Sequence, residues 1–447
     1  MKRRDFVTRI IAAGGALSMG VGCGRKINVN PDEKASEGIS TSESGKTITE
    51  PAREIQVLAE TDVLVIGGGP AGVAAAISAS RAGAETYLVE RYNHLGGLWT
   101  GGLVLPYLST HAVDKHHRRR QVIYGLGGEM AQRLFDLGMA IHEINPVIDP
   151  EAGKFVLDEM IVEAGVKMLY HSWGVNAIMD GKTIKGVFIE SKSGRQAVLA
   201  KVVIDCTGDG DVFHWAGENY ENMHYHIGLV HRLGNVDRIN KNASGYKELP
   251  IGNETPIPSV NWVNMHGHND QNGIDMLNLS ELQLEYRRNI WESVEEIRNT
   301  PGYEDVFLLD TASQMGVRMS RILDGEYRLT LEDSMTYKNF DDAIGISGAW
   351  TTMLYNGKKV VPAKRPMWQI PYRSLLPKST ENLIVAGRCF CFEKELVEDT
   401  RIIGTCLVTG HGAGAAAARA IKERELVRNI DIPKLRKLLV EQNVWFG

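Results

Sequence analysis

Three glycines at a fixed spacing, Gly67, Gly69 and Gly72, form the pattern in this chain that most directly indicates chemistry. They follow the apolar run at residues 63–66, and Glu90 ends the next apolar run, eighteen positions after Gly72. Glycines in such a turn let main-chain amides and the N-terminus of the next helix approach a diphosphate. An acidic residue at the end of the second run accepts hydrogen bonds from ribose hydroxyls and repels a 2′-phosphate. The pattern therefore predicts a site for FAD or NAD and not for NADP.

The segments around these glycines are typical of a βαβ unit. Residues 63–66 and 86–89 are apolar runs of the kind found in buried parallel strands, and residues 73–82 between them have a small-residue helical pattern ending at Gly83. Beyond this unit, the sequence predicts a β-hairpin from residues 183–190 and 196–204, a helix at 279–297, a buried strand at 383–388 and, over 404–419, a loop that runs into an alanine-rich helix.

Several ordered motifs along the chain resemble a known family. They are GGLWTGG at 96–102, CTGDGD at 206–211, GVRMSRILDGEY at 316–327, IPYR at 370–373 and NLIVAGR at 382–388. Together with the glycine turn, they resemble FAD-dependent oxidoreductases of the glutathione-reductase-like superfamily, and within it a broad bacterial group. The resemblance spans about residues 62–423 and implies an α/β fold. In that fold a Rossmann-like FAD-binding domain contains an inserted, β-rich α+β substrate domain.

The resemblance implies that FAD is held by residues spread over the chain. The cofactor-binding residues that it implies are Gly67, Gly69, Pro70, Ala71, Gly72, Glu90, Arg91, Gly97, Leu98, Val175, Gly208, Asp209, Gly387, Arg388, Gly404 and Gly412. Backbone around Val175, in the run Trp173, Gly174 and Val175, is expected to meet adenine, or else simply to start a strand. Arg388 is expected to reach the ribitol or the pyrophosphate, with a purely structural role as the alternative. The segment from Gly404 is expected to aim a helix N-terminus at the flavin, where the helix dipole stabilises negative charge.

Four arginines and one histidine are the candidates for handling the substrate. Arg318, Arg321, Arg373 and Arg401 lie in family-like blocks, and guanidinium groups there suit an anionic or oxygen-rich substrate. Ion pairs that hold the domains together are the alternative for all four. His411 lies in the last alanine-rich segment and is a candidate proton donor or anion stabiliser at the flavin edge. A histidine that is merely satisfied within the helix is the competing interpretation.

Other polar and sulfur-containing residues point to no further chemistry. Cys389 and Cys391 are too close for an unstrained disulfide, and with Cys406 they are expected to be buried apolar residues. The histidines of residues 224–231 lack accompanying ligands, so no metal is expected. The basic run at 116–120 is expected to be a solvated face, with contact to a substrate phosphate or a membrane surface as the alternative. Glu393 and Glu395 are either solvated charges or a substitute base.

The expected activity is hydride transfer between N5 of FAD and a small polar substrate, such as a sugar derivative or a hydroxy acid. Only one glycine turn of this kind is visible, and FAD would occupy it, so the electron partner is expected to be an unidentified carrier other than NAD. Two alternatives stay open. One is a flavoprotein that uses FAD structurally, as an isomerase, a lyase or a binding protein. The other is an NAD-dependent dehydrogenase, which would be colourless when purified.

The N-terminal residues are typical of an export signal. Residues 1–23 contain Arg3 and Arg4 before a weakly apolar stretch and resemble a twin-arginine signal. Cys23 ends a lipobox-like sequence that departs from the usual pattern at Gly20, so a lipid anchor at Cys23 and its absence both stay open. We therefore expect an exported protein, periplasmic or anchored at the cell envelope, whose membrane contact is confined to that anchor.

Length and composition set the remaining bounds. The chain has 447 residues, and 50 Lys and Arg against 55 Asp and Glu give a net charge of −5, which does not favour a nucleic-acid partner. We expect a flexible tether at 24–58, the first part of the FAD-binding domain at 59–215, a substrate domain at 216–375 and the C-terminal part of the FAD-binding domain at 376–447. The sequence leaves the substrate, the direction of transfer and the oligomeric state undetermined.

Overall fold

The structure is a computed structural model that describes residues 47–447 except 115, 117, 349–352, 356–357 and 361–366. The predicted export signal, Cys23 and most of the predicted tether lie outside the described residues. Residues 49–447 form one compact unit. Within the described residues, no helix combines the length and apolar character needed to cross a membrane.

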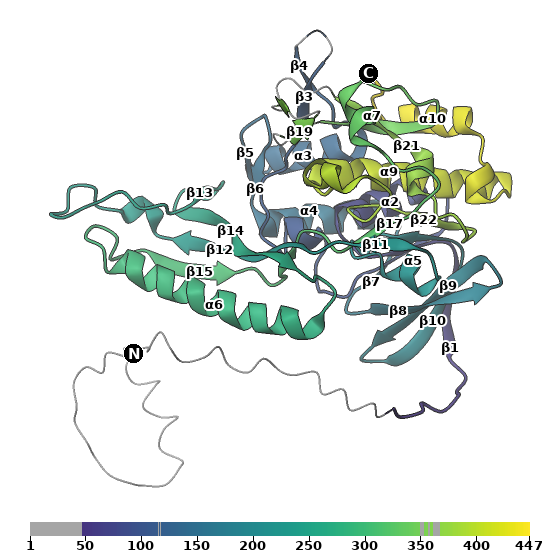
Figure 1. The fold of residues 1–447 in the computed structure, drawn as a ribbon, viewed down its shortest axis with the longest axis horizontal. Coiled ribbons are helices and arrows are strands. Elements are labelled where there is room, and N and C mark those ends of the chain that lie inside the picture. Colours follow the sequence, from purple (N-terminus) through teal and green to yellow (C-terminus); the bar gives the residue numbers. More distant parts are fainter. Residues whose placement is uncertain (1–46, 115, 117, 349–352, 356–357, 361–366) are drawn as a thin grey trace. The chain divides into compact units, whose positions relative to one another are not determined.

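A seven-stranded mixed sheet forms the centre of the molecule (Figure 1). Its order is β7-β2-β1-β10-β9-β8, with β22 paired to β10. The strands are β1 (Gln56–Ile66), β2 (Thr86–Val89), β7 (Lys167–Leu169), β8 (Trp173–Asp180), β9 (Thr183–Ser191), β10 (Gly194–Asp205) and β22 (Leu383–Val385). Strands β7, β2, β1, β10 and β22 are parallel, whereas β8, β9 and β10 form an antiparallel meander. The sheet is therefore a Rossmann-type arrangement extended by the predicted hairpin.

Two long helices pack on one another beside this sheet, α2 (Pro70–Arg81) and α9 (Ile403–Glu423). Small residues make this approach possible: a Cβ on Gly410 would lie 2.0 Å from the carbonyl oxygen of Ala71, and one on Gly414 would lie 2.1 Å from that of Ala75. Helices α3 (Gly125–Asp136) and α4 (Pro150–Glu163) pack next to α2, and the short α5 (Asp211–Trp215) packs against β8. The alanine-rich sequence of α9 thus serves close helix packing.

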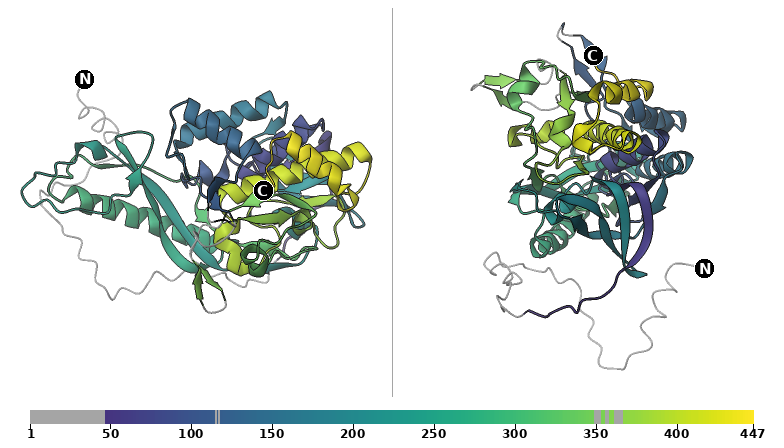
Figure 2. Two further views of the ribbon diagram at one scale, coloured as in Figure 1. Left: turned by 90° about the horizontal axis from the view of Figure 1, so that it is seen from above. Right: turned by 90° about the vertical axis from the view of Figure 1, so that its right-hand side faces the viewer.

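A second sheet of five strands extends away from this centre (Figure 2). Its order is β13-β14-β12-β15, with β16 paired to β12, and its strands are β12 (Tyr225–Gly234), β13 (Asn253–Glu254), β14 (Val260–Gln271), β15 (Phe307–Thr311) and β16 (Gly316–Val317). The helix α6 (Met276–Arg298) packs on it through Leu282, Tyr286, Ile290 and Val294, which recur every four residues on one face and are buried. This sheet has its own apolar core.

Shorter elements complete the structure. They are β3 (His111–Val113), β4 (Arg119–Gln121), β5 (Ala140–Ile141), β6 (Val147–Ile148), β11 (Tyr220–Asn222), β17 (Arg321–Leu323), α7 (Leu331–Met335), β18 (Ala343–Ser347), β19 (Met353–Tyr355), β20 (Lys358–Val360), β21 (Trp368–Pro371), α8 (Val397–Thr400) and α10 (Ile432–Glu441), with 3₁₀ turns at Gly97–Trp99, Val236–Arg238, Tyr372–Leu375, Lys394–Leu396 and Val427–Asn429.

The predicted α/β class is confirmed, and so are the βαβ unit and the hairpin. Two boundaries differ from expectation. Strand β1 begins at Gln56, inside the last residues of the predicted tether, because it pairs with β10 from Gln196 onwards. Helix α9 begins at Ile403, so no loop precedes its alanine-rich part. The domain boundaries within residues 59–447 stay predictions.

Candidate functional site

The three glycines of the turn between β1 and α2 have different surroundings: two are packed closely against backbone and one faces open space. Gly67 has a φ of +101°, and a Cβ there would lie 2.4 Å from the carbonyl oxygen of Cys206. A Cβ on Gly72 would lie 1.7 Å from the carbonyl oxygen of Gly67. A Cβ on Gly69, in contrast, would have no described atom within 4 Å apart from its chain neighbours. Gly67 and Gly72 are therefore required by the fold, and Gly69 leaves room for a ligand.

The start of α2 is open to an anion. Gly69 is the N-cap, and its position provides no side chain to accept hydrogen bonds from the first-turn amides. The first turn contains no acidic residue among the described side chains. A diphosphate placed there would satisfy main-chain amides and meet the positive end of the helix dipole.

One large pocket passes this turn and continues to the second sheet. Its volume is about 930 Å³, near the top of the range of about 300–1,000 Å³ that is usual for small-molecule and cofactor sites. At the turn it is lined by Gly67, Gly69, Pro70, Ala71, Glu90, Arg91, Gly97, Leu98, Gly208, Asp209, Gly387 and Arg388. Towards the second sheet it is lined by Trp262, Asn264, Gln314, Val317, Arg318, Glu398 and Arg401. Residues of both predicted groups therefore share one cavity.

Glu90 ends β2 as predicted, and its side chain is held by the backbone. Its Oε2 accepts a hydrogen bond from the amide of Gly68 at 2.6 Å, and its Oε1 accepts one from the amide of Tyr92 at 2.8 Å. A carboxylate has about four lone-pair positions, so both oxygens can still accept hydrogen bonds from ribose hydroxyls. The structure thus fixes the orientation of Glu90 before any ligand binds.

Next to Glu90, Arg91 and the start of β8 form the end wall of the pocket. The guanidinium of Arg91 lies over the rings of Tyr92 and Trp173, at 5.0 and 5.4 Å from their centroids. The lining here consists of Ser172, Trp173 and Gly174, whereas Val175 is not among the lining residues. Two residues of the predicted run, Trp173 and Gly174, therefore line the cavity, whereas Val175 itself does not, and contact with adenine stays a prediction.

Asp209 and Arg388 form a largely buried ion pair beside the glycine turn. Arg388 Nη2 lies 2.7 Å from Asp209 Oδ1, which also accepts a 2.7 Å hydrogen bond from the hydroxyl of Ser320. Burial disfavours the charge of Asp209, but Arg388 and Arg91 outweigh this effect and lower its pKa. Arg388 Nε is buried and has no hydrogen-bond partner within the described structure. Arg388 therefore combines a structural contact with a position in the pocket lining.

Helix α9 opens into the same pocket at its N-terminus. Ile402, the N-cap, and Ile403 line the cavity, together with Cys406 in the first turn. Gly404 and Gly412 do not line it. A Cβ on Gly404 would meet the carbonyl oxygen of Leu108 at 2.9 Å, and one on Gly412 would meet Ile344 at 2.6 Å. The prediction of a helix N-terminus at the pocket is thus supported, but its two glycines pack against protein.

His411 lies away from the pocket, and its predicted redox role is corrected. It follows Ile403 by eight residues, which places it about 12 Å along the helix from the N-terminus. Its Nε2 lies 2.6 Å from Gln442 Oε1, and its ring backs onto Gly125. Burial lowers the pKa of His411 to about 4. The competing interpretation, a histidine satisfied within the protein, describes this position.

Arg373 also lies outside the pocket lining. Its guanidinium stacks over Tyr327 at 4.6 Å and lies 3.6 Å from Asp342 Oδ1. Arg321 is similarly engaged in protein contacts: it donates hydrogen bonds to the carbonyl oxygen of Asp209 and to Asp211 Oδ1, at 2.8 and 2.9 Å. The prediction that Arg373 grips substrate is corrected, because its aromatic and acidic neighbours hold it elsewhere.

Arg318 and Arg401 do meet in the pocket, beside two residues that sequence reasoning missed. Glu398 accepts a hydrogen bond from Arg401 Nε at 3.2 Å and a second, shorter one from Arg401 Nη2. Tyr225 donates its hydroxyl to Glu398 Oε1 at 2.8 Å, and Arg318 Nη1 lies 3.9 Å from the same oxygen. The three-residue spacing of Glu398 and Arg401 was a signal for their pairing, whereas nothing in the sequence pointed to Tyr225.

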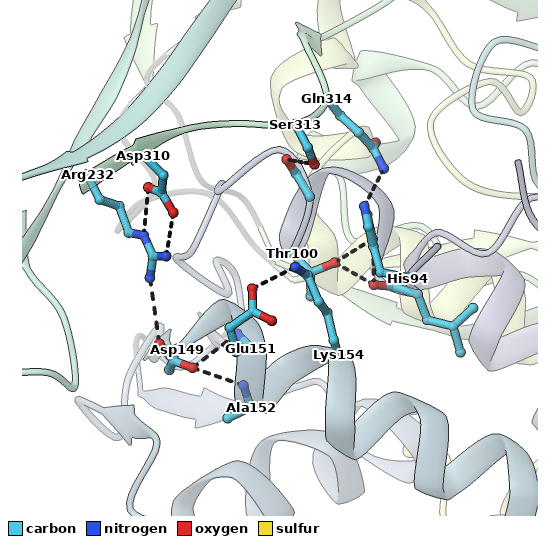
Figure 3. A network of polar contacts seen from close by, with 12 residues as sticks. His94, Thr100, Asp149, Glu151, Ala152, Lys154, Arg232, Asp310, Ser313 and Gln314 are labelled. Atoms are coloured by element: carbon cyan, nitrogen blue, oxygen red, sulfur yellow. Dashed lines mark hydrogen bonds and ion pairs between the residues drawn. The ribbon is translucent and has the colours of Figure 1, made fainter. Parts of the chain in front are cut away.

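Gln314, which also lines the pocket, is held by a buried histidine (Figure 3). Gln314 Nε2 lies 3.3 Å from His94 Nε2, and His94 Nδ1 lies 3.3 Å from the carbonyl oxygen of Leu95. Burial lowers the pKa of His94, which keeps its ring neutral. A neutral ring that donates through Nδ1 accepts through Nε2, so His94 fixes the direction of the Gln314 amide.

Arg232 connects the second sheet to the central part of the molecule (Figure 3). It donates two hydrogen bonds to Asp310, at 3.0 and 2.6 Å, and its Nη1 lies 3.7 Å from Asp149 Oδ2. Asp149 caps the first turn of α4 through the amides of Glu151 and Ala152. This chain of contacts holds β12 and β15 of the second sheet against α4.

The remaining sequence expectations concern the cysteines and Glu393. Cys389, Cys391 and Cys406 are buried free thiols, and burial raises the pKa of each, as expected of apolar residues. Glu393 accepts a hydrogen bond from the amide of Leu331 at 2.8 Å, which gives it a structural role instead of a catalytic one.

These features fit FAD. The cavity offers open space above Gly69, unpartnered amides at the start of α2, an oriented carboxylate at Glu90 and, within the described structure, an unpartnered buried donor on Arg388. A second helix N-terminus, that of α9, reaches the same cavity. Each of these positions was expected to bind one part of the dinucleotide, and one cavity now connects them.

Comparison with known proteins gives the same picture. The chain matches the family described as FAD dependent oxidoreductase over residues 62–232 and 237–439. It is 28% identical over 167 residues to a thiamine thiazole synthase of Methanococcus aeolicus, covering 33% of this chain and 55% of the relative. It is 25% identical over 172 residues to a digeranylgeranylglycerophospholipid reductase of Methanosarcina acetivorans, covering 35% and 40%. The chain spans about half the length of the first curated relatives it matches.

Among solved structures, a geranylgeranyl bacteriochlorophyll reductase-like protein of Thermoplasma acidophilum aligns with 86% of this chain and 84% of its own, with a TM-score of 0.45 and 16% identity. The family match covers most of the chain and includes the segments that line the pocket from both sides. The chain therefore belongs to the FAD dependent oxidoreductase family and is an enzyme that uses FAD.

Proposed function

We propose that this enzyme exchanges a hydride between FAD and a small polar substrate bound beside Arg318 and Arg401. The observation that carries the proposal is the continuity of the pocket, which runs from the glycine turn at Gly67–Gly72 to these two arginines. FAD supplies the redox chemistry when it is bound, because its N5 accepts or releases the hydride. The protein supplies orientation, charge and the exclusion of water.

The roles of the protein groups follow from their positions. The start of α2 and Glu90 would hold the diphosphate and the ribose of FAD, and the positive dipole at the start of α9 would stabilise negative charge on a flavin bound in the pocket. Glu398 is ionised, because Arg401, Tyr225 and Arg318 outweigh its burial and lower its pKa. It therefore positions Arg401 and does not act as an acid. Burial raises the pKa of Tyr225 to about 12. Its phenol therefore stays protonated and donates a hydrogen bond to Glu398.

Export and the electron partner belong to the same proposal. The N-terminal residues resemble a twin-arginine signal, and one glycine turn serves FAD in the sequence. An exported enzyme has no nicotinamide pool, so the proposed partner is a small or membrane-bound carrier. Rapid anaerobic mixing with NADH tests this part: we expect no loss of flavin absorbance, and rapid bleaching would overturn it.

The substrate part is tested by anaerobic photometry of the purified holoenzyme. We expect that at least one member of a panel of hydroxy acids, sugar acids and polyols reduces the bound flavin within a turnover time. The observation that would refute hydride exchange is a flavin that stays oxidised while the enzyme converts one of these compounds.

A further inference from the structure

The guanidinium of Arg318 lines the pocket and has few interaction partners in the protein. It donates no hydrogen bond within the described structure, and its nearest carboxylate contact is the 3.9 Å approach of Nη1 to Glu398. Arg401, by contrast, donates two hydrogen bonds to Glu398. A buried donor without a partner costs free energy, because it has lost its bound water without gaining an acceptor. Arg318 therefore occupies a position that an acceptor from outside the protein would complete.

The charged groups that act on Arg318 do not balance. Arg318 and Arg401 bring two positive charges, and Glu398 brings one negative charge that is already shared with Arg401 and with the hydroxyl of Tyr225. Burial and the neighbouring Arg401 lower the pKa of Arg318, and burial and Arg318 also lower that of His226. The positive charges of Arg318 and Arg401 thus act on each other and on His226.

A guanidinium recognises one ligand group especially well. Its planar fork of N–H donors matches the two oxygens of a carboxylate, and such charge-assisted pairs are stronger than hydrogen bonds to neutral hydroxyls. A single carboxylate would also neutralise the one positive charge in excess. A neutral polyol would leave that charge without compensation in a partly desolvated site.

We propose that the substrate of this enzyme is a carboxylic acid, and that Arg318, supported by Arg401, binds its carboxylate. This inference rests on the proposed function, which it narrows from small polar molecules to acids. Glu398 and Tyr225 act as positioning residues that hold Arg401 in place without neutralising Arg318.

The test compares two pairs of ligands that differ in the charged group. Lactate is paired with lactamide, and gluconate with glucitol. Each compound is titrated into the oxidised holoenzyme of the full chain, and the change in the flavin absorbance spectrum gives its dissociation constant. We expect at least one acid to bind 10-fold or more tightly than its neutral partner. If neither acid binds more tightly than its partner, the proposal is wrong.

Three variants assign the effect to the site. Arg318→Gln is expected to weaken binding of the acid by about 10- to 100-fold and to leave binding of the neutral partner unchanged. Arg318→Lys keeps the charge without the fork and is expected to restore part of the loss. Arg119→Gln removes one positive charge from β4, where the side chain is exposed, and is the matched control. Equal weakening in Arg318→Gln and Arg119→Gln would also overturn the proposal.

Flavin content and melting temperature of each variant separate binding defects from misfolding. Anaerobic reduction of the flavin separates this inference from the proposed function. Selective acid binding without reduction by any compound supports the carboxylate site and contradicts hydride exchange. Reduction by glucitol or lactamide, with no preference for the acids, supports hydride exchange and contradicts the carboxylate site.

Discussion

The two ends of the pocket are built in different ways. The cofactor end is formed largely by main-chain atoms of one short stretch, Gly67–Gly72, with Glu90 held by backbone amides. The substrate end is formed by side chains from separate segments: Tyr225 on β12, Arg318 after β16, and Glu398 and Arg401 in and after α8. A backbone site can recognise only what all its ligands share, here a diphosphate. A side-chain site can change its ligand while the fold stays the same.

The two ends of the pocket also differ in what a substitution would disturb: packing at the cofactor end and electrostatic interactions at the substrate end. At the cofactor end, a single added methyl group would collide with backbone, because Gly72 touches Gly67 and Gly410 touches Ala71. At the substrate end, a substitution changes electrostatic interactions between side chains that are partly exposed. Errors at the first end should therefore damage the fold, whereas errors at the second should change ligand binding.

The largest effect is expected for Gly72→Ala. This substitution tests whether close packing at the cofactor end excludes any side chain at this position. The new Cβ would lie 1.7 Å from the carbonyl oxygen of Gly67, and this backbone has no flexible way to yield. We expect a loss of about 3 kcal/mol or more in the free energy of unfolding, together with loss of FAD. Urea denaturation and the flavin-to-protein ratio measure both. A stable, yellow variant would show that packing around Gly72 tolerates a methyl group, which contradicts this explanation.

The second effect concerns His411, which the sequence assigned to the flavin and the structure assigns to packing. Its folded pKa of about 4 lies below the ordinary value of 6.5. As the pH falls below 6.5, the unfolded chain takes up a proton that the folded protein refuses, so stability is lost until the pH reaches about 4. The total loss is about 3 kcal/mol, with about 2 kcal/mol between pH 7 and pH 5.

Urea denaturation at pH 7 and pH 5 measures this dependence in the wild type and in His411→Gln. The variant is expected to lose less stability on acidification by about 2 kcal/mol. His116→Gln, at an exposed histidine, is the control and should follow the wild type. Equal pH dependence in all three proteins would show that His411 is not the buried, neutral group that the structure describes.

A smaller and more selective effect is expected for Gly69→Ala, because Gly69, unlike Gly72, has open space around it. Gly69 has a φ of −68°, which alanine adopts without strain, and nothing in the described structure occupies the space of its Cβ. The apoprotein should keep its stability to within about 1 kcal/mol. FAD should bind about 10-fold or more weakly, because the methyl group enters the space of the diphosphate. Fluorescence titration of the apoprotein with FAD would reveal an unchanged affinity and thereby contradict the site.

The smallest effect is expected for Arg373→Gln, a residue that the sequence placed at the substrate end. Its side chain is 43% exposed, and its guanidinium contacts the rings of Tyr327 and Phe340 and the carboxylate of Asp342. We expect a loss of about 0.5–1 kcal/mol in stability and no change in the binding of lactate or gluconate. A loss of acid binding that matches Arg318→Gln would place Arg373 at the pocket after all.

Features that depend on contacts close in the sequence were predicted correctly, whereas features that depend on contacts between distant segments were not. The βαβ unit and the place of Glu90 at the end of its second strand depend on neighbours within about thirty residues, and they were predicted with nearly correct boundaries. The position of His411 depended on where α9 begins and on which face of that helix is covered by α2, α3 and α10. A motif in the sequence fixes neither of these, so the predicted role failed.

The amino-acid sequence alone was enough to predict a diphosphate-binding turn at Gly67–Gly72, because glycine spacing and strand pattern act within one continuous segment. Only the tertiary structure decided which arginines face the pocket and which are neutralised. Tyr225 and Glu398 meet across 173 residues of chain and hold Arg401, while Arg318 is left with excess charge. The physical reason is that a side chain's charge and partners depend on segments that folding alone brings together.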